Sequence, residues 1–292
     1  MIRMSSLRNI DRNAKPPKAK YTSFDLLNAS EKGDITKITD IIENSTLSIT
    51  DVKNNEGKTA LHVAAKFDRI DVMKLLLEKT KESVNITDYN NNTPLLLASF
   101  QGNNNMIKLL LNALADVNFQ NKYGNTPLIG VFFPPFNNMK ECLVQLLDRK
   151  ANTSIQNAEG TTALLNCAAC GDVDCFKLLL GRGSNIQETN NNTRNSMHLA
   201  VLNFSSDLLN YLISEYKELA SQQDDDGNTP LHICCYIGYT LGLRILLSSD
   251  FYKSNKKCLE IKNNYGHSAL FVACGRGNKN IVTSLINSGA EV

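Results

Sequence analysis

The sequence has no long apolar run and little net charge. A membrane-spanning helix needs about 18 or more consecutive apolar residues, and no such run occurs in the 292 residues. The first residues also lack the apolar core of about 7 to 15 residues that a secretory signal carries. We therefore expect no membrane span, and a chain that acts in the cytoplasm or the nucleus.

The formal net charge of +2 is unevenly distributed. The first twenty residues hold one acid, Asp11, against the basic residues Arg3, Arg8, Arg12, Lys15, Lys18 and Lys20, so that this segment carries +5 and the remainder −3. Because protein surfaces that bind nucleic acids are strongly basic, we expect no nucleic-acid binding by the remainder of the chain. Residues 1–20 are poor in apolar side chains and predict a disordered basic arm. A nuclear-import patch, a contact with an anionic surface and a targeting segment stay open as its roles.

Groups of residues that carry catalysis or bind metal are also missing. No Ser or Cys nucleophile is placed beside a spare base and an orienting acid, as acyl transfer requires. Cys167 and Cys170 form one Cys-x-x-Cys, but no second pair or nearby His completes a zinc site. Asp224 to Asp226 lack the closing Glu of a calcium loop. The sequence predicts no enzyme, no cofactor and no metal, and eight reduced cysteines that pack as small apolar side chains.

A short pattern recurs through most of the chain. Gly227–Cys234 reads Gly-Asn-Thr-Pro-Leu-His-Ile-Cys, with near matches at Gly57–Ala64 and Gly124–Val131. The third residues of the copies are Thr59, Thr93, Thr126, Thr162, Asn195, Thr229 and Ser268, spaced 34, 33, 36, 33, 34 and 39 residues apart. Thr at this position suits a helix N-cap, a following Pro suits the first helical position, and the Gly two residues earlier suits a turn with positive φ. Asn91 and Thr193 replace that glycine in the second and fifth copies.

A Thr-Pro-Leu-His head with a period near 33 resembles the ankyrin repeat. The resemblance implies an all-α repeat solenoid of helix-turn-helix units with β-hairpin loops, with about seven ankyrin repeats after an N-terminal capping helix pair. It also implies that His62, His198 and His232, at the fourth motif position, bridge neighbouring repeats by hydrogen bonds. One repeat cannot bury its apolar faces alone, so each must pack on its neighbours. The expected apolar column is Leu61, Leu95, Leu128, Leu164, Met197, Leu231 and Leu270.

The period predicts one domain over residues 21–292, after the arm of residues 1–20. We expect an N-terminal cap at 21–50 and repeats at 51–84, 85–117, 118–153, 154–186, 187–220, 221–259 and 260–292. The seventh repeat has no polar capping unit behind it, so we expect the natural chain to continue past Val292.

Two insertions interrupt the period. Phe132, Phe133, Pro134, Pro135 and Phe136 replace the usual turn between the helices of the third repeat. Their aromatic rings either protrude or fill the core between repeats. The spacing of 39 residues predicts a longer, solvated loop around Ser248–Lys257.

The resemblance places partner binding in a concave groove lined by hairpin tips and by the ends of the first helices. Candidate partner-binding residues are Phe67, Phe100, Phe133, Pro134, Phe136, Leu202 and Tyr236 near helix ends, and Tyr89, Tyr123, Asp226 and Tyr265 at hairpin tips. Aromatic anchors are common interface hot spots, although half-burial between repeats is an open alternative. With acidic tips at Glu56, Glu159 and Asp226, the groove suits a peptide that has apolar anchors and some basic residues.

We therefore expect a monomeric, non-catalytic scaffold or adaptor for protein–protein interaction. Two alternatives stay open: a regulatory ankyrin module of a longer signalling enzyme or channel, and an inhibitor of a partner enzyme. The sequence does not identify the partner protein.

Overall fold

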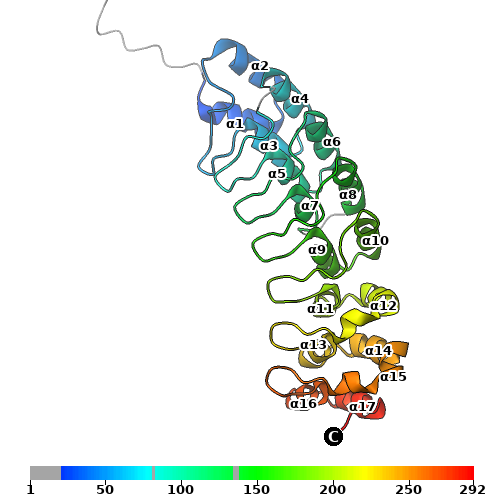
Figure 1. The fold of residues 1–292 in the computed structure, drawn as a ribbon. Coiled ribbons are helices and arrows are strands. Elements are labelled where there is room, and N and C mark those ends of the chain that lie inside the picture. Colours follow the sequence, from blue (N-terminus) through cyan, green and yellow to red (C-terminus); the bar gives the residue numbers. More distant parts are fainter. Residues whose placement is uncertain (1–20, 81–82, 134–137) are drawn as a thin grey trace, which may run out of the picture.

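The computed structural model describes residues 21–80, 83–133 and 138–292, and most of its helices form stacked pairs (Figure 1). The first helix of each pair, the inner helix, is α1 (Ser23–Lys32), α3 (Ala60–Lys66), α5 (Pro94–Phe100), α7 (Pro127–Gly130), α9 (Ala163–Cys170), α11 (Ser196–Leu202), α13 (Pro230–Ile237) or α16 (Ala269–Gly275). The second, the outer helix, is α2 (Ile35–Asn44), α4 (Ile70–Lys79), α6 (Asn104–Asn112), α8 (Met139–Asp148), α10 (Val173–Gly181), α12 (Ser206–Glu215), α14 (Thr240–Ser248) or α17 (Lys279–Asn287).

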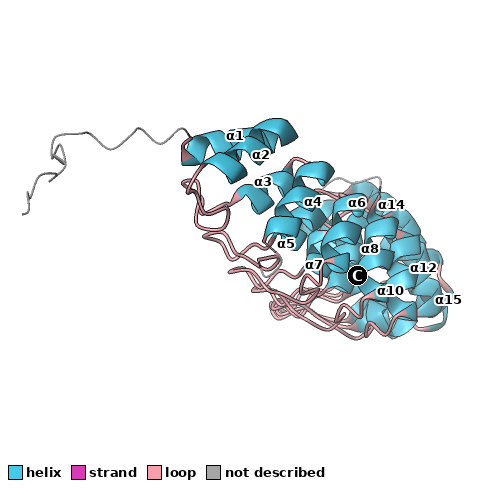
Figure 2. Cartoon of the chain, turned by 90° about the horizontal axis from the view of Figure 1, so that it is seen from above, coloured by secondary structure: helices cyan, strands magenta, loops and turns pink. Residues whose placement is uncertain are grey.

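Inner and outer helices form two columns, and the hairpin loops extend from the inner column (Figure 1). Viewed from above, these loops gather along one edge of the stack (Figure 2). The three described ranges hold helices but no strand. This arrangement confirms the all-α solenoid, with α1 and α2 ahead of seven repeats.

The inner helices begin as the motif predicts. The side chain of Thr93 accepts a hydrogen bond from the Leu96 N–H, and Thr126 and Thr162 cap their helices in the same way. Pro94, Pro127 and Pro230 occupy the first turn of their helices, where a missing N–H removes no helical hydrogen bond. The expected apolar column, from Leu61 to Leu270, is buried throughout.

The hairpin turns need a backbone with positive φ. Gly57 has φ of +77°, and a Cβ there would lie 2.5 Å from the ring of Tyr89 in the next hairpin. Asn91 and Thr193 adopt the same region, with φ of +58° and +55°. Asn tolerates this conformation better than Thr does, yet the fifth hairpin still has the common shape.

One Asn or Asp in each hairpin organises the turn. Its side-chain oxygen accepts the N–H groups of the residues two and four positions later, as Asn121 does for Tyr123 and Asn125, both at 2.9 Å. The residues in this role are Asn54, Asp88, Asn121, Asn157, Asn190, Asp224 and Asn263. An asparagine is therefore the structural acceptor in five of the seven repeats, and an aspartate takes this role in the other two.

Neighbouring hairpins are joined at their tips by backbone hydrogen bonds. The Tyr89 N–H donates to the Glu56 carbonyl at 3.0 Å, and the Asn264 N–H donates to the Asp226 carbonyl at 3.0 Å. Equivalent bonds link each consecutive pair of the seven hairpins. Because each tip is tied to the next, side chains on neighbouring tips keep a fixed spacing.

The three motif histidines bridge repeats, as the resemblance implied. Nδ1 of His62 accepts the Thr59 N–H at 3.2 Å, so Nε2 carries the proton that it donates to the Asn92 carbonyl at 2.9 Å in the next repeat. His198 and His232 make the same bonds to the carbonyls of Asn228 and His267. Burial lowers the pKa of all three, for His198 to about 4. These side chains are structural and neutral.

The expectation of a solvated loop around Ser248–Lys257 is wrong. The segment forms helix α15 (Asp250–Ser254) and the 3₁₀ helix η2 (Lys256–Glu260), and Tyr252 joins α15 to the 3₁₀ helix η1 (Lys217–Ser221) of the preceding repeat. Tyr252 is 1% exposed, and its hydroxyl donates to the Ala220 carbonyl at 3.1 Å. The insertion adds a buried aromatic anchor, which explains why it is helical.

In the third repeat, α7 ends at Gly130, and Phe132 is buried while the ring of Phe133 is partly exposed. The prediction that one of these rings fills the core between repeats is thus confirmed for Phe132. Pro134, Pro135 and Phe136 lie outside the described residues, as do residues 1–20.

Six of the eight cysteines are buried and none forms a disulfide. Burial raises the pKa of the Cys142, Cys175 and Cys235 thiols to about 12. The packing prediction is wrong for Cys170 and Cys274, which are exposed. Cys274 lies on α16, and the described chain places no further inner helix against it.

Candidate functional site: an aromatic cleft on the hairpin side

The candidate partner-binding residues that the structure describes lie in two rows on the hairpin side of the stack. Phe67, Phe100, Phe133, Leu202 and Tyr236 lie at the ends of inner helices or just beyond them, while Tyr89, Tyr123, Asp226 and Tyr265 lie at hairpin tips. Tyr236 is 58% exposed and Tyr265 is 70% exposed, whereas Phe100 and Leu202 are half-buried. Some candidate side chains are therefore exposed on the groove, and others are half-buried between repeats.

Four of these residues meet in one cleft, here called the aromatic cleft. It has a volume of about 620 Å³, and it is lined by Leu202, Asp226, Tyr236 and Tyr265 together with residues that the sequence did not single out. One wall is the pair of hairpins at Asp224–Asn228 and Asn263–His267, and the floor is formed by inner helices α13 and α16.

The floor of the aromatic cleft is aliphatic. Ile233, Ile237 and Val272 line it from α13 and α16, and Leu202 adds an apolar side chain from the end of α11. The position four residues after each N-cap supplies Ile233 and Val272. This position faces the groove because the N-cap and the hairpin fix where each inner helix begins.

Two groups of stacked planar side chains form the rims of the aromatic cleft. The Arg276 guanidinium lies 3.7 Å from the centroid of the Tyr236 ring, and its Nε donates to the Tyr236 carbonyl at 3.2 Å. His267 stacks on Phe271 with centroids 4.1 Å apart, and Tyr265 stacks on His267 at 6.1 Å. Stacked rings have few rotamers left to lose when a partner binds, which lowers the entropic cost of binding.

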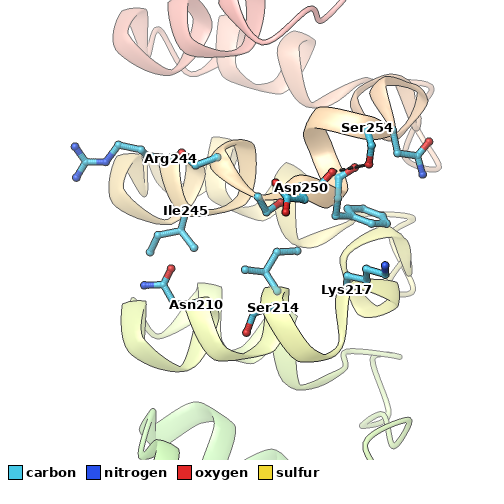
Figure 3. Close-up of a pocket in the computed structure, with 12 residues that line it drawn as sticks. Asn210, Ser214, Lys217, Arg244, Ile245, Asp250 and Ser254 are labelled. Atoms are coloured by element: carbon cyan, nitrogen blue, oxygen red, sulfur yellow. Dashed lines mark hydrogen bonds between the residues drawn. The ribbon is translucent and has the colours of Figure 1, made fainter.

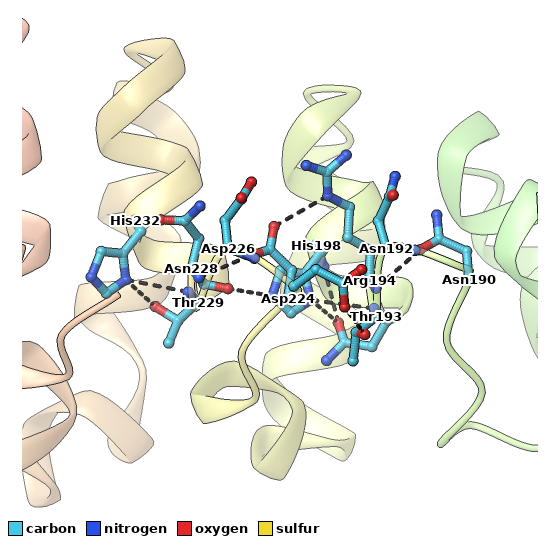
Figure 4. Close-up of polar contacts among 12 residues, drawn as sticks. Asn190, Asn192, Thr193, Arg194, His198, Asp224, Asp226, Asn228, Thr229 and His232 are labelled. Atoms are coloured by element: carbon cyan, nitrogen blue, oxygen red, sulfur yellow. Dashed lines mark hydrogen bonds and ion pairs between the residues drawn. The ribbon is translucent and has the colours of Figure 1, made fainter. Parts of the chain in front are cut away.

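The charged groups of the aromatic cleft are the Arg194–Asp224 ion pair, the exposed carboxylate of Asp226 and the exposed guanidinium of Arg276. Asp224 is 1% exposed at its side chain and forms an ion pair with Arg194, Nε to Oδ2, at 3.2 Å (Figure 4). Its other oxygen accepts the N–H groups of Asp226 and Asn228, so the carboxylate is fully used. Asp226 is exposed, and its carboxylate forms no ion pair with any described residue.

The other candidate residues do not join this cleft. Phe100 and Phe133 contact each other edge to face, with centroids 5.3 Å apart, and form a second aromatic patch on the middle repeats. Phe67 lies beside the Lys66 ammonium at 5.5 Å. Tyr89 packs against the preceding hairpin at Gly57.

Sequence reasoning missed Phe271 and Arg276. Phe271 stands at the fourth motif position, where His62, His198 and His232 form their bridges, yet it is 57% exposed. The replacement of the motif histidine by phenylalanine is the feature of the sequence that could have indicated Phe271 as a site residue. Arg276 follows the end of α16, at the helix end where aromatic side chains occur in other repeats.

A second cleft of about 950 Å³ lies on the outer-helix side, between α12 and α14–α15 (Figure 3). Serine and asparagine side chains line it with Lys217, Arg244 and Asp250, and Ile213, Ile245 and Phe251 add apolar surface. Ser254 donates to the Asp250 carbonyl at 2.5 Å within α15. This cleft follows from the helical insertion, and none of its residues resembles a catalytic set.

Across the described residues, no group of His, Cys, Asp and Glu side chains could hold a metal ion. None of the described helices is both long and apolar enough to cross a membrane.

Comparison with known proteins identifies the family. The sequence model described as "Ankyrin repeats (3 copies)" matches residues 26–121, 135–221 and 203–292. The chain is 27% identical over 196 residues to the nuclear factor NF-kappa-B p105 subunit of Gallus gallus, covering 66% of this chain and 16% of that protein. It is 37% identical over 92 residues to the 26S proteasome non-ATPase regulatory subunit 10 of Dictyostelium discoideum, covering 32% and 39%. It is 30% identical over 103 residues to the human NF-kappa-B inhibitor alpha, covering 35% and 32%.

The chain thus spans well under two thirds of the length of these relatives. The family match, in contrast, extends over most of its own length and coincides with the stacked helix pairs. This chain belongs to the ankyrin-repeat family.

Proposed function

We propose that this chain is a non-catalytic scaffold or adaptor that binds a partner protein through its concave groove, the surface between the hairpin tips and the ends of the inner helices. Ankyrin repeats mediate protein–protein interaction. The observation that supports this groove as the site is the aromatic cleft, where exposed rings surround an aliphatic floor. Such an arrangement of rigid aromatic groups around a concave apolar surface is typical of interface hot spots.

A second candidate function is inhibition of a partner protein. The match to a relative whose name describes it as an inhibitor favours this alternative. Both functions use the same groove, and they differ in whether binding blocks the partner's activity. Adding the purified chain to an assay of the captured partner decides between them.

We also propose that the chain acts as a monomer in the cytoplasm or nucleus. Eight free cysteines support a reducing compartment.

The groove is tested by capturing partners from cell lysate. The chain is compared with a variant that carries Phe67, Phe100, Phe133 and Tyr236 changed to Ser. A matched control carries Phe24→Ser, which removes a 73% exposed ring from α1, outside the aromatic cleft. Circular dichroism first confirms that all three proteins fold equally.

Proteins that bind the wild-type chain and the control but not the groove variant would support the proposal. Equal capture by all three well-folded proteins would contradict it.

A further inference from the structure

The aromatic cleft carries opposite charges at its two ends. Asp226 lies in the hairpin that precedes α13, whereas Arg276 covers the ring of Tyr236 near the C-terminal end of α13. The eight residues of α13 span about 12 Å at about 1.5 Å per residue. The hairpin end of the cleft is therefore acidic and the helix end is basic, with the aliphatic floor between them.

Neither end charge is neutralised within the described chain. Arg194 and Asp224 neutralise each other below the rim, and Asp225 accepts a hydrogen bond from the Thr193 hydroxyl. Asp226 and Arg276 form no ion pair with any described residue. A guanidinium that stacks on a ring keeps the edge of its plane available to a carboxylate.

We infer that the aromatic cleft binds an extended segment of the partner protein in which an apolar side chain lies between a basic residue and an acidic residue. This inference rests on the proposed function, because it names the partner chemistry of the same groove. The basic side chain pairs with Asp226 beside the Tyr265 ring, the apolar side chain enters between Ile233 and Val272, and the acidic side chain pairs with Arg276.

The spacing follows from the length of α13. An extended chain advances about 3.3 Å per residue, so a segment that follows the roughly 12 Å of α13 has its basic and acidic positions about three or four residues apart, with about two or three residues between them. The volume of about 620 Å³ lies within the range of about 300–1,000 Å³ that is typical of ligand-binding pockets, so the cleft has room for a few side chains. The cleft therefore suits a short peptide motif with a fixed direction across the groove.

A selection from a phage-displayed library of random peptides tests this inference. The full chain is used as bait beside two charge reversals, Asp226→Lys and Arg276→Glu. A control is Glu78→Lys, which reverses an exposed acid on outer helix α4, away from the hairpin tips and outside the cleft.

The wild-type chain and Glu78→Lys should enrich the same basic–apolar–acidic motif. Asp226→Lys should replace the basic position by an acidic one, and Arg276→Glu should replace the acidic position by a basic one. For one synthetic peptide from the wild-type selection, Asp226→Lys should raise Kd at least about tenfold, since close charge pairs at interfaces contribute about 1.5 kcal/mol or more.

Three results would overturn the inference. If the enriched peptides bind, and lose binding to Tyr236→Ser, but show no charge pattern, the inference fails and the proposed function stands. If Asp226→Lys and Arg276→Glu both enrich the wild-type peptide motif, the inference also fails and the proposed function stands. If no peptide is enriched over the empty support, both the inference and the proposed groove are contradicted.

Discussion

Replacing Asn121 tests whether the hairpin acceptor stabilises the array. Asn121 is 7% exposed, and its side chain makes three hydrogen bonds: it accepts from the N–H groups of Tyr123 and Asn125, and it donates to Oδ1 of Asn92 in the preceding hairpin, all at 2.9 Å. Asn121→Ala removes all three and leaves two backbone N–H groups without an acceptor. At about 1 kcal/mol per bond, the free energy of unfolding should fall by about 3 kcal/mol.

Asn121→Asp separates the two roles of this side chain. The carboxylate still accepts both N–H groups, but it places a negative oxygen beside the side-chain oxygen Oδ1 of Asn92. Asn92 cannot reverse its amide without loss, because its Nδ2 donates to Asp88 at 2.9 Å. We expect a loss of about 2 kcal/mol, intermediate between wild type and Asn121→Ala.

Urea unfolding followed by circular dichroism measures both changes. Asn105→Ala is the control, because Asn105 is exposed on α6 and its replacement should alter stability by no more than about 0.5 kcal/mol. A loss below about 1 kcal/mol for Asn121→Ala would refute the acceptor role. Equal stability of Asn121→Asp and wild type would refute a contribution from the bond that Asn121 donates to Asn92.

Three further predictions concern the Arg194–Asp224 ion pair, the bridging histidine His198 and the shortest inner helix. Arg194→Ala should cost about 3 kcal/mol because it leaves the Asp224 carboxylate buried and unpaired; in urea melts Asp224→Asn should restore most of that loss, and no restoration would contradict the pairing. Burial lowers the pKa of His198 from about 6.5 to about 4, so between these pH values the unfolded chain binds a proton that the folded chain does not. The contribution of His198 to the free energy of unfolding, about 3 kcal/mol, is therefore complete above about pH 6.5 and is lost as the pH falls towards about 4. NMR titration should find its midpoint near pH 4, and a midpoint near 6.5 would contradict the burial argument. In hydrogen exchange, α7 should lose protection before the other inner helices because it has only four residues, and equal protection of α5, α7 and α9 would be evidence against this.

Sequence reasoning succeeded where bonding is local. The N-cap residues, the prolines and the hairpin glycines act within about four residues of their own position, so their spacing alone predicted where each inner helix begins. His62 and His198 reach the next repeat, but the repeated motif fixes that distance, and the family resemblance supplied their role.

Prediction failed where the result depends on a particular neighbour. The segment around Tyr252 looked like a solvated insertion, and only its docking against Ala220 shows why it is helical. Cys274 is exposed although equivalent positions are buried. The aromatic cleft was predicted in part, through Tyr236 and Tyr265, but the stacking of Arg276 requires the relative placement of two inner helices.

The central claim is that a partner protein lies in the aromatic cleft. Site-specific photo-crosslinking tests it directly, with p-benzoylphenylalanine placed at Tyr236, which lines the cleft, or at Phe24 as the exposed aromatic control. The account predicts that illumination in cells links a discrete partner to position 236 and not to position 24, and that Asp226→Lys weakens the crosslink. Crosslinks of equal yield at both positions, or none at position 236 while the partner is still captured by the chain, would contradict it.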